Sequence, residues 1–85
     1  MEIYYSSKFA REYRRISLTI KKSAEKAEEI FCKNPDDSRL KTHKLHGKYR
    51  KYYAFWVNNE YRIMFQFLKN NSVVFINIGT HEIYK

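Results

Sequence analysis

The chain has 85 residues, of which 17 are Lys or Arg and 9 are Asp or Glu, so its formal net charge is +8 with neutral histidines. Apolar residues make up 44% of the sequence and aromatic residues 18%, enough for the core of one small domain over residues 1–85 and evidence against disorder. One cysteine excludes a disulfide framework and a four-cysteine zinc site, and two glycines exclude a glycine-rich phosphate loop.

The first half of the sequence predicts a short strand and two helices. Residues 2–5 are typical of a strand, and Ser6 or Ser7 is a suitable helix N-cap. Apolar residues then recur every three or four positions, the spacing of a helix with one buried stripe. A single helix over residues 8–33 would be about 39 Å long, more than the width of such a domain. We therefore expect a break at Ser17–Thr19, where residues of poor helix propensity meet. The stripe consists of Phe9, Tyr13, Ile16, Ile20, Ala24, Ala27 and Phe31.

The second half changes its apolar period from 3.6 to 2, after residues 34–37 (Asn-Pro-Asp-Asp) end the second helix. Aromatic and β-branched residues gather at 52–57, 61–68 and 73–78, and asparagine-rich turns separate these runs. The pattern predicts a three-stranded antiparallel meander, which the N-terminal strand extends to a four-stranded sheet. The fold class is α+β, with both helices packed on one face of the sheet.

The last hairpin fixes the neighbours of one arginine. A two-residue turn at 70–71 would place Arg62 opposite Gly79. Because glycine has no side chain, this register leaves room for a phosphate beside the guanidinium. The alternative is that Arg62 forms an ion pair with Glu60 or Glu82. One face of the hairpin is then apolar and packs on the helices, whereas the other carries Arg, Gln and Asn and is not a second core. The helix-facing pairs would be Phe67–Val74, Phe65–Ile76 and Ile63–Ile78.

Basic residues concentrate at 38–51, a stretch with six Lys or Arg, two of the three histidines and no acid. Such a field attracts polyanions, and the tyrosines between the cations can stack on bases. Nucleic acid is therefore the favoured partner, and a solvated basic surface without a ligand is the alternative. The candidate nucleic-acid-binding residues are Lys41, Lys44, His46, Lys48, Arg50 and Lys51.

Two further features concern the compartment and the cysteine. No apolar run reaches the roughly 18 residues that a transmembrane helix needs, and the first residues lack a signal segment. We therefore expect a cytoplasmic protein without a membrane span. Cys32 lies in a helical stretch, and we expect it to be a small core residue rather than a reactive thiol.

Titratable residues of the second half could cleave RNA without a metal or another cofactor. That reaction needs a base for the 2′-hydroxyl, an acid for the departing 5′-oxygen and a cation for the charge on phosphorus. Histidine suits the proton transfers and arginine suits the phosphate. The candidates are His43, His46, His81, Glu60 and Arg62, and we expect Arg62 and His81 to lie side by side, open to solvent. A metal site at His43 and His46 is the competing interpretation, but no Asp or Cys nearby completes a ligand set.

Four elements of the second half follow one another in a recognisable order. They are His43-Lys44-Leu45-His46-Gly47, Ala54-Phe55-Trp56-Val57, Glu60-Tyr61-Arg62-Ile63 and Ile78-Gly79-Thr80-His81. In this order and spacing they resemble the RelE/ParE toxin superfamily, and within it the YafQ- and YoeB-like branch. The resemblance implies a RelE-like fold and a toxin of a type II toxin–antitoxin module. It also implies a ribosome-dependent endoribonuclease that cleaves mRNA in the A site of the 70S ribosome, with a cognate acidic antitoxin as partner.

The resemblance further implies roles for single residues. His81 matches the histidine of the Gly-Thr-His element and would be the general acid, whereas His43 or Glu60 would be the base. Arg62 would stabilise the transition state, and Tyr84 would align the nucleotide.

Some positions depart from the family pattern. Trp56 stands where YafQ-like members have another functional histidine, so that contribution is missing or replaced by stacking. Arg39 stands where the YoeB-like branch has a glutamate, and position 46 is usually not histidine. Two sheet lysines of the RelE branch correspond to Tyr53 and Phe55.

The alternative function is that of ParE-like members, which inhibit DNA gyrase by binding and have no nuclease activity. A third interpretation is a basic nucleic-acid-binding domain without activity.

Overall fold

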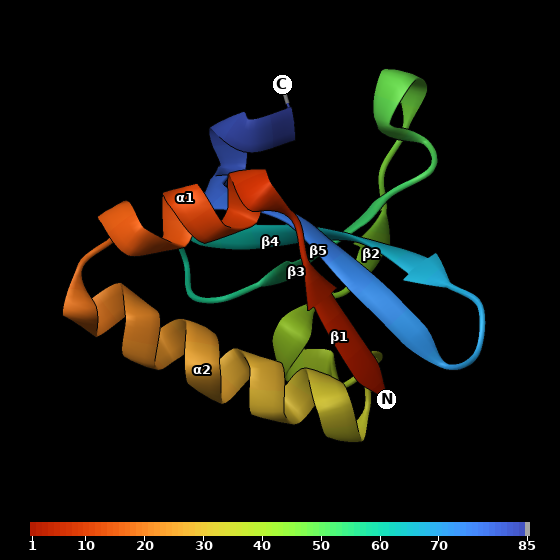
Figure 1. The fold of residues 1–85 in the computed structure, drawn as a ribbon, viewed down its shortest axis with the longest axis horizontal. Coiled ribbons are helices and arrows are strands. Elements are labelled where there is room, and N and C mark those ends of the chain that lie inside the picture. Colours follow the sequence, from red (N-terminus) through yellow and green to blue (C-terminus); the bar gives the residue numbers. More distant parts are fainter. Residues whose placement is uncertain (85) are drawn as a thin grey trace.

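Two helices pack against one face of a five-stranded sheet (Figure 1). The structure is a computed structural model that describes residues 1–84, and the side chains of residues 1–83. In this part of the chain the elements are β1 (Glu2–Tyr5), α1 (Ser7–Arg15), α2 (Leu18–Lys33), β2 (His43–Lys44), β3 (Tyr53–Trp56), β4 (Tyr61–Leu68) and β5 (Ser72–Thr80). Short 3₁₀ turns lie at Ser38–Leu40 (η1), Gly47–Tyr49 (η2) and His81–Tyr84 (η3). The α+β class is confirmed.

The predicted break between the helices is confirmed, and a serine begins each helix. The Ser6 hydroxyl accepts a hydrogen bond from the backbone N–H of Phe9 at 3.0 Å, which identifies Ser6 as the N-cap. Ile16 adopts an extended conformation, and the Ser17 hydroxyl then accepts from Ile20 N at 3.3 Å to start α2. Asn34 ends α2, as the sequence predicts.

The strand order is β1-β5-β4-β3-β2, with β1 parallel to β5 and the other neighbours antiparallel. The predicted meander and its N-terminal neighbour are confirmed. The expected total of four strands is wrong, because His43 and Lys44 pair with Ala54 and Tyr53 as a fifth strand. Two residues are too few to show a period of 2 in a sequence, so this strand depends on its neighbour.

The predicted register of the last hairpin is right at one end and wrong at the other. Arg62 pairs with Gly79 and Ile63 with Ile78, as expected. Beyond Met64 a bulge shifts the register, so that the expected pairs Phe65–Ile76 and Phe67–Val74 become Phe65–Phe75 and Phe67–Val73. The turn has three residues, 69–71, and uses left-handed asparagines at 70 and 71. The longer turn shifts the strand pairing by one residue and the bulge shifts it back, so the pairs at the Arg62 end are the expected ones.

Helix α1 satisfies the backbone groups that the bulge leaves unpaired. The Ser6 hydroxyl donates to Ile76 O at 2.6 Å, and a Glu12 carboxylate oxygen accepts from Ile78 N at 3.0 Å. A bulged strand needs such partners because its ladder is interrupted there. Phe75 and Ile78 consequently both face the helices, and the strand beyond them keeps its place.

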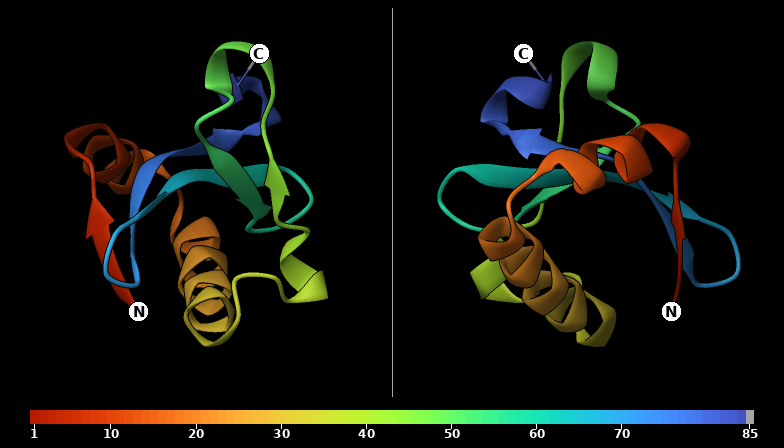
Figure 2. Two further views of the ribbon diagram at one scale, coloured as in Figure 1. Left: turned by 90° about the vertical axis from the view of Figure 1, so that its right-hand side faces the viewer. Right: turned by 60° about the vertical axis from the view of Figure 1, so that its left-hand side comes forward.

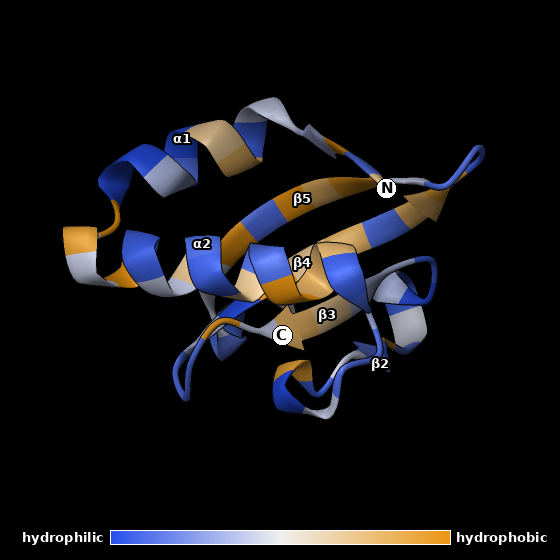
Figure 3. Ribbon diagram, turned by 90° about the horizontal axis from the view of Figure 1, so that it is seen from below, coloured by the Kyte–Doolittle hydropathy of each residue, from blue (hydrophilic) through white to orange (hydrophobic). Residues whose placement is uncertain are grey.

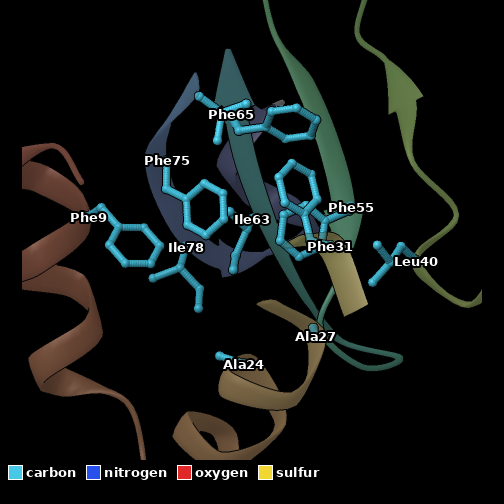
Figure 4. Packing of buried hydrophobic residues seen from close by; sticks show 11 residues of the cluster. Phe9, Ala24, Ala27, Phe31, Leu40, Phe55, Ile63, Phe65, Phe75 and Ile78 are labelled. Carbon is cyan, nitrogen blue, oxygen red and sulfur yellow. The ribbon is translucent and has the colours of Figure 1, made fainter. Parts of the chain in front are cut away.

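The core lies between the helices and the sheet, where four phenylalanines meet (Figure 4). Phe31 of α2 stacks on Phe55 with ring centroids 4.8 Å apart and touches Phe65 and Phe75 edge-on. Cys32 is exposed, so its predicted core position is wrong. Successive helix residues point about 100° apart, so Phe31 occupies the buried stripe and Cys32 does not. Burial and nearby Glu28 raise the pKa of the Cys32 thiol, which does not favour a reactive thiolate.

The other face of the sheet carries no long helix. Figure 2 shows α2 on one side of the sheet, with the segment around residues 45–51 and the last turn η3 rising on the opposite side. From the α2 side, hydrophobic positions of β3, β4 and β5 lie behind the helix (Figure 3). We call the side away from α2 the open face.

Candidate active site

The strand register gathers several candidate residues on the open face. One row of cross-strand neighbours is His43, Ala54, Met64 and Asn77, and the next is Trp56, Arg62 and Gly79. Directly opposed residues point to the same face of a sheet, so the two rows share one side. His43 and Arg62 are therefore brought to one surface, although they are 19 positions apart in the sequence.

The open face also has a small apolar cluster, which the sequence analysis excluded. Leu45, Ala54 and Met64 are buried there, with four half-buried neighbours around them: Tyr49, Tyr52, Ile76 and Ile83. The bulge is one cause, because it turns Ile76 away from the main core. The 45–51 segment is the other, since it folds over the sheet and supplies Leu45. The expectation that this face is not a second core is therefore wrong.

Arg62 is buried, with only 7% of its surface exposed. Its guanidinium carbon lies 3.9 Å from the centre of the Trp56 ring, and Nη1 donates to Asn58 O at 2.7 Å and Tyr61 O at 3.0 Å. The expectation that the guanidinium is open to solvent is therefore wrong. The alternative, an ion pair of Arg62 with Glu60 or Glu82, is wrong as well. Within the described part of the chain no carboxylate pairs with Arg62, and its hydrogen bonds use Nη1 alone.

The space expected beside Arg62 is occupied. A Cβ placed on Gly79 would come within 2.5 Å of the Ile83 side chain. Ile83 belongs to η3, which folds back over the end of β5. Gly79 therefore admits this turn and not a phosphate, which corrects the sequence interpretation.

His43 is exposed on β2, and its Nδ1 lies 2.9 Å from the backbone oxygen of Lys41. A carbonyl oxygen only accepts hydrogen bonds, so Nδ1 carries the proton. In the neutral ring the lone pair is then on Nε2. A histidine held in this tautomer is suited to take a proton.

His81 begins η3 and remains exposed, with 58% of its side chain accessible. Its Nε2 lies 3.4 Å from a carboxylate oxygen of Glu82. Because Thr80 pairs with Tyr61, His81 and Arg62 lie at the same end of the hairpin. The side-by-side arrangement of these two side chains stays a prediction, and the shared end of the hairpin is compatible with it.

Two other predicted catalytic residues occupy less defined positions. Glu60 is exposed in the turn between β3 and β4, where its backbone N–H donates to the Asn58 side chain at 2.9 Å. Tyr84 belongs to η3 by its backbone, and its side chain lies outside the described residues. The structure therefore places Glu60 near the Arg62 end of β4, and the two side chains form no ion pair.

The predicted nucleic-acid-binding residues lie along the edge of the open face. Lys44, His46, Lys48, Arg50 and Lys51 are all exposed. A hollow of about 430 Å³ is lined by His43, Lys44, Leu45, His46 and Tyr49. Lys41 is exposed as well, and its ammonium lies 5.0 Å from the centre of the Trp56 ring.

Arg39 does not join this group. Its guanidinium forms two hydrogen bonds, of 3.0 and 2.9 Å, with the Asp37 carboxylate. These bonds lower the pKa of Asp37 to about 2. The basic stretch of the sequence is thus divided in space, and the open face receives the cations that follow Arg39.

Sequence reasoning missed two residues of this face. Trp56 was treated as a lost histidine, yet it contacts two cations, and its pairing with Arg62 follows from the β3–β4 register. Asn77 is only 2% exposed, and its Oδ1 has no hydrogen-bond partner in the structure. A single asparagine in an otherwise apolar strand was the available signal for it. Among residues 1–84, no three His, Cys, Asp or Glu side chains gather where a metal ion could bind.

Comparison of the sequence with known protein families identifies the family of this chain. The family described as the RelE-like toxin of the type II toxin–antitoxin system HigB matches residues 4–81. No curated protein sequence is significantly similar to the chain. No helix in the described part of the chain is long and apolar enough to cross a membrane.

Solved structures share the fold at low sequence identity. YafQ from E. coli is 18% identical, with 98% of this chain and 96% of that chain covered and a TM-score of 0.79. A YoeB/ParE toxin from Agrobacterium tumefaciens is 14% identical, with coverages of 95% and 99% and a TM-score of 0.79. The YoeB–YefM complex from Staphylococcus aureus matches at 18% identity, coverages of 95% and 97% and a TM-score of 0.76. At these identities the likeness establishes the fold alone.

Proposed function

Because this chain belongs to the RelE-like toxins of type II toxin–antitoxin systems, we propose that it is an endoribonuclease that cuts mRNA in the ribosomal A site. One observation carries this proposal. An imidazole in a proton-accepting tautomer and a guanidinium that pairs with no carboxylate among the described side chains share the open face, beside a run of exposed cations. These are the base and the cation of metal-independent RNA cleavage, which needs an acid besides them.

The first step is removal of the 2′-hydroxyl proton by Nε2 of His43. The hydrogen bond from Nδ1 to Lys41 O fixes the ring in the tautomer that this step requires. The 2′-oxygen then bonds to phosphorus, and the bond from phosphorus to the 5′-oxygen breaks. The structure therefore favours His43 over Glu60 as the base, since Glu60 has no comparable anchor.

The second step is protonation of the departing 5′-oxygen by His81, which leaves a 2′,3′-cyclic phosphate and a 5′-hydroxyl. The imidazole of His81 is exposed, and its Nε2 lies 3.4 Å from a carboxylate oxygen of Glu82. Arg62 supplies positive charge to the phosphorus oxygens. Two backbone carbonyls hold its Nη1, and the N–H groups of Nη2 and Nε remain for the substrate.

The test is codon-dependent cleavage on programmed ribosomes. His43→Ala and His81→Ala should each lower the cleavage rate about 10²- to 10⁴-fold, the usual contribution of general acid–base catalysis. His46→Ala is the comparison, because His46 is an exposed histidine of the same segment that we assign to RNA binding and not to proton transfer, so it should weaken binding without a comparable loss of the cleavage rate. Near-wild-type cleavage by both His43→Ala and His81→Ala would refute the mechanism.

A cognate antitoxin is the proposed partner in the cytoplasm. The YoeB of Staphylococcus aureus was solved in complex with YefM, and this chain has the same fold. An acidic, partly disordered protein would neutralise the exposed cations of residues 41–51 and cover the open face. Co-expression of the neighbouring gene product should restore growth and co-purify with the toxin, and the complex should weaken at high salt.

Gyrase inhibition is the second candidate. It is favoured by the burial of Arg62, which departs from a guanidinium open to a substrate. Purified toxin should then block DNA supercoiling by gyrase and leave messages intact. Truncated messages with normal supercoiling would exclude it.

A further inference from the structure

Two cations meet on one indole ring at the edge of the open face. The centre of the Trp56 ring is 3.9 Å from the Arg62 guanidinium carbon and 5.0 Å from the Lys41 ammonium. Both distances are within the range of cation–π interactions. Since a separation cannot exceed the sum of these two distances, the two charges lie at most about 9 Å apart.

The two cations come from segments on either side of β3. Arg62 is the direct cross-strand partner of Trp56 on β4, whereas Lys41 lies two residues before β2, the strand on the other side of β3. The Arg62 guanidinium carbon is 3.9 Å from the ring centre, so the indole holds a cation where a nucleotide base would otherwise stack. The stacking role that its aromatic character suggested is therefore replaced by the placement of charges.

The backbone holds each cation in its place. Lys41 adopts a left-handed conformation with φ 50°, which is uncommon for a residue with a side chain. It lies between buried Leu40 and Thr42, whose hydroxyl donates to Pro35 O at 2.5 Å. Arg62 is held by its hydrogen bonds to two backbone oxygens. Two fixed positive charges thus stand close together.

Neither cation has a carboxylate partner among the described residues. A buried positive charge without an anion is unfavourable, so the arrangement calls for an anionic ligand. Phosphodiester oxygens fit it, because a guanidinium donates two parallel hydrogen bonds and an ammonium acts as a point charge. The carbonyl oxygen of Lys41 also accepts a hydrogen bond from Nδ1 of His43, so the same residue joins this pair to the proposed base.

We propose that Lys41 and Arg62 form one binding subsite for the RNA backbone, in which Trp56 is the positioning residue that sets the two charges. The identity of the ligand as RNA rests on the proposed function, whereas binding of a phosphodiester does not depend on cleavage. The subsite gives Lys41 a defined place beside Arg62 and adds Trp56 as the residue that positions both charges.

The sequence offers a direct probe, because Trp56 is its only tryptophan. Intrinsic fluorescence of the full chain is titrated with a short 2′-deoxy oligonucleotide, which cannot be cleaved, and with inorganic phosphate. Occupation of the subsite by the oligonucleotide should change the emission in a saturable way. Binding of the oligonucleotide without an emission change would overturn the proposal.

Lys41→Met and Lys44→Met are a matched pair of variants. Both remove one exposed ammonium from the same segment, but only Lys41 contacts Trp56. Affinity and the salt dependence of binding should fall in both, the latter by about one phosphate contact. The emission change should be lost or inverted only in Lys41→Met. Identical fluorescence titrations of the two variants would contradict the proposal.

Trp56→Phe and Trp56→Leu separate positioning from packing. Phenylalanine keeps a ring for the cations and leucine does not, so binding of a labelled oligonucleotide should fall about 3- to 30-fold in Trp56→Leu and recover in Trp56→Phe. Equal losses in both variants would mean that Trp56 has only a structural role.

The two proposals can fail separately. If ribosome-dependent cleavage fails but the fluorescence response persists, the proposed function is wrong and the subsite is supported. If cleavage occurs without the response, the reverse holds.

Discussion

The two faces of the sheet use the same strands for different purposes. On the helix side, Phe55, Phe65 and Phe75 are fully buried against α2 and contribute only apolar atoms. On the open face, the alternate positions of these strands carry Trp56, Met64 and Asn77. The first face stabilises the domain, and the second holds buried polar groups that stability alone does not explain. Placing chemistry on one side of a sheet is possible because the other side supplies the core.

The first prediction tests the helix side. Phe31→Ala should lower the free energy of unfolding by about 3–5 kcal/mol, because Phe31 is fully buried among three other phenylalanines and leaves a cavity. Chemical denaturation followed by circular dichroism measures the loss. Phe67→Ala is the control, since Phe67 is 44% exposed and should cost much less. Equal losses would mean that the aromatic cluster is not the stabilising core.

The second prediction concerns the connection between the two faces. Glu12→Ala removes the acceptor for the Ile78 N–H at the bulge and should cost about 1–3 kcal/mol of stability. It should also lower cleavage, because the bulge sets the position of β5 and of His81 beyond it. Glu12→Gln keeps an acceptor and should recover most of both. Glu25→Ala, an exposed glutamate on α2, is the control.

The sequence predicted the elements that repeat a period and missed those that depend on contacts. The helices and the three long strands each show several apolar positions at regular spacing, and all were found. Strand β2 has two residues, and the bulge at Ile76 depends on partners from α1, so neither has a local signal. A residue's type suggests chemistry, but its exposure is a tertiary property.

The candidate site shows the same division. Residue types suggested the candidates, and the register of the last hairpin correctly placed Arg62 opposite Gly79. The burial of Arg62 could not be predicted, because it requires Trp56 beside it and two carbonyls turned toward it. Likewise, the sequence interpretation left space for a ligand beside Gly79. The turn η3 fills that space, and its position has no signal in the sequence.

The third prediction tests whether the open face sacrifices stability. Asn77 keeps a buried oxygen without a hydrogen-bond partner, which is unfavourable. Asn77→Leu should therefore raise the free energy of unfolding by about 1 kcal/mol and the melting temperature by about 4–8 °C. A lower cleavage rate in the same variant would mean that the orphan oxygen serves the substrate. Destabilisation by the leucine would show that the asparagine is satisfied in solution.

The smallest expected effect lies in the loop that separates the two sides, at the Asp37–Arg39 ion pair. Two hydrogen bonds from the Arg39 side chain, the main cause, lower the pKa of Asp37 from 3.8 to about 2. A carboxylate with a lowered pKa stabilises the folded state fully above its unfolded pKa and loses that contribution as pH falls toward about 2. Asp37→Asn should therefore change stability at neutral pH slightly and flatten the loss of stability between about pH 4 and 2. Acid denaturation followed by circular dichroism measures this, with exposed Asp36→Asn as the control.

Because Arg39 lies apart from the open face, the Asp37→Asn variant should bind oligonucleotide as the wild type does. A clear gain in affinity would mean that a released Arg39 reaches the RNA, and that the boundary between the two sides is less strict than the ion pair implies.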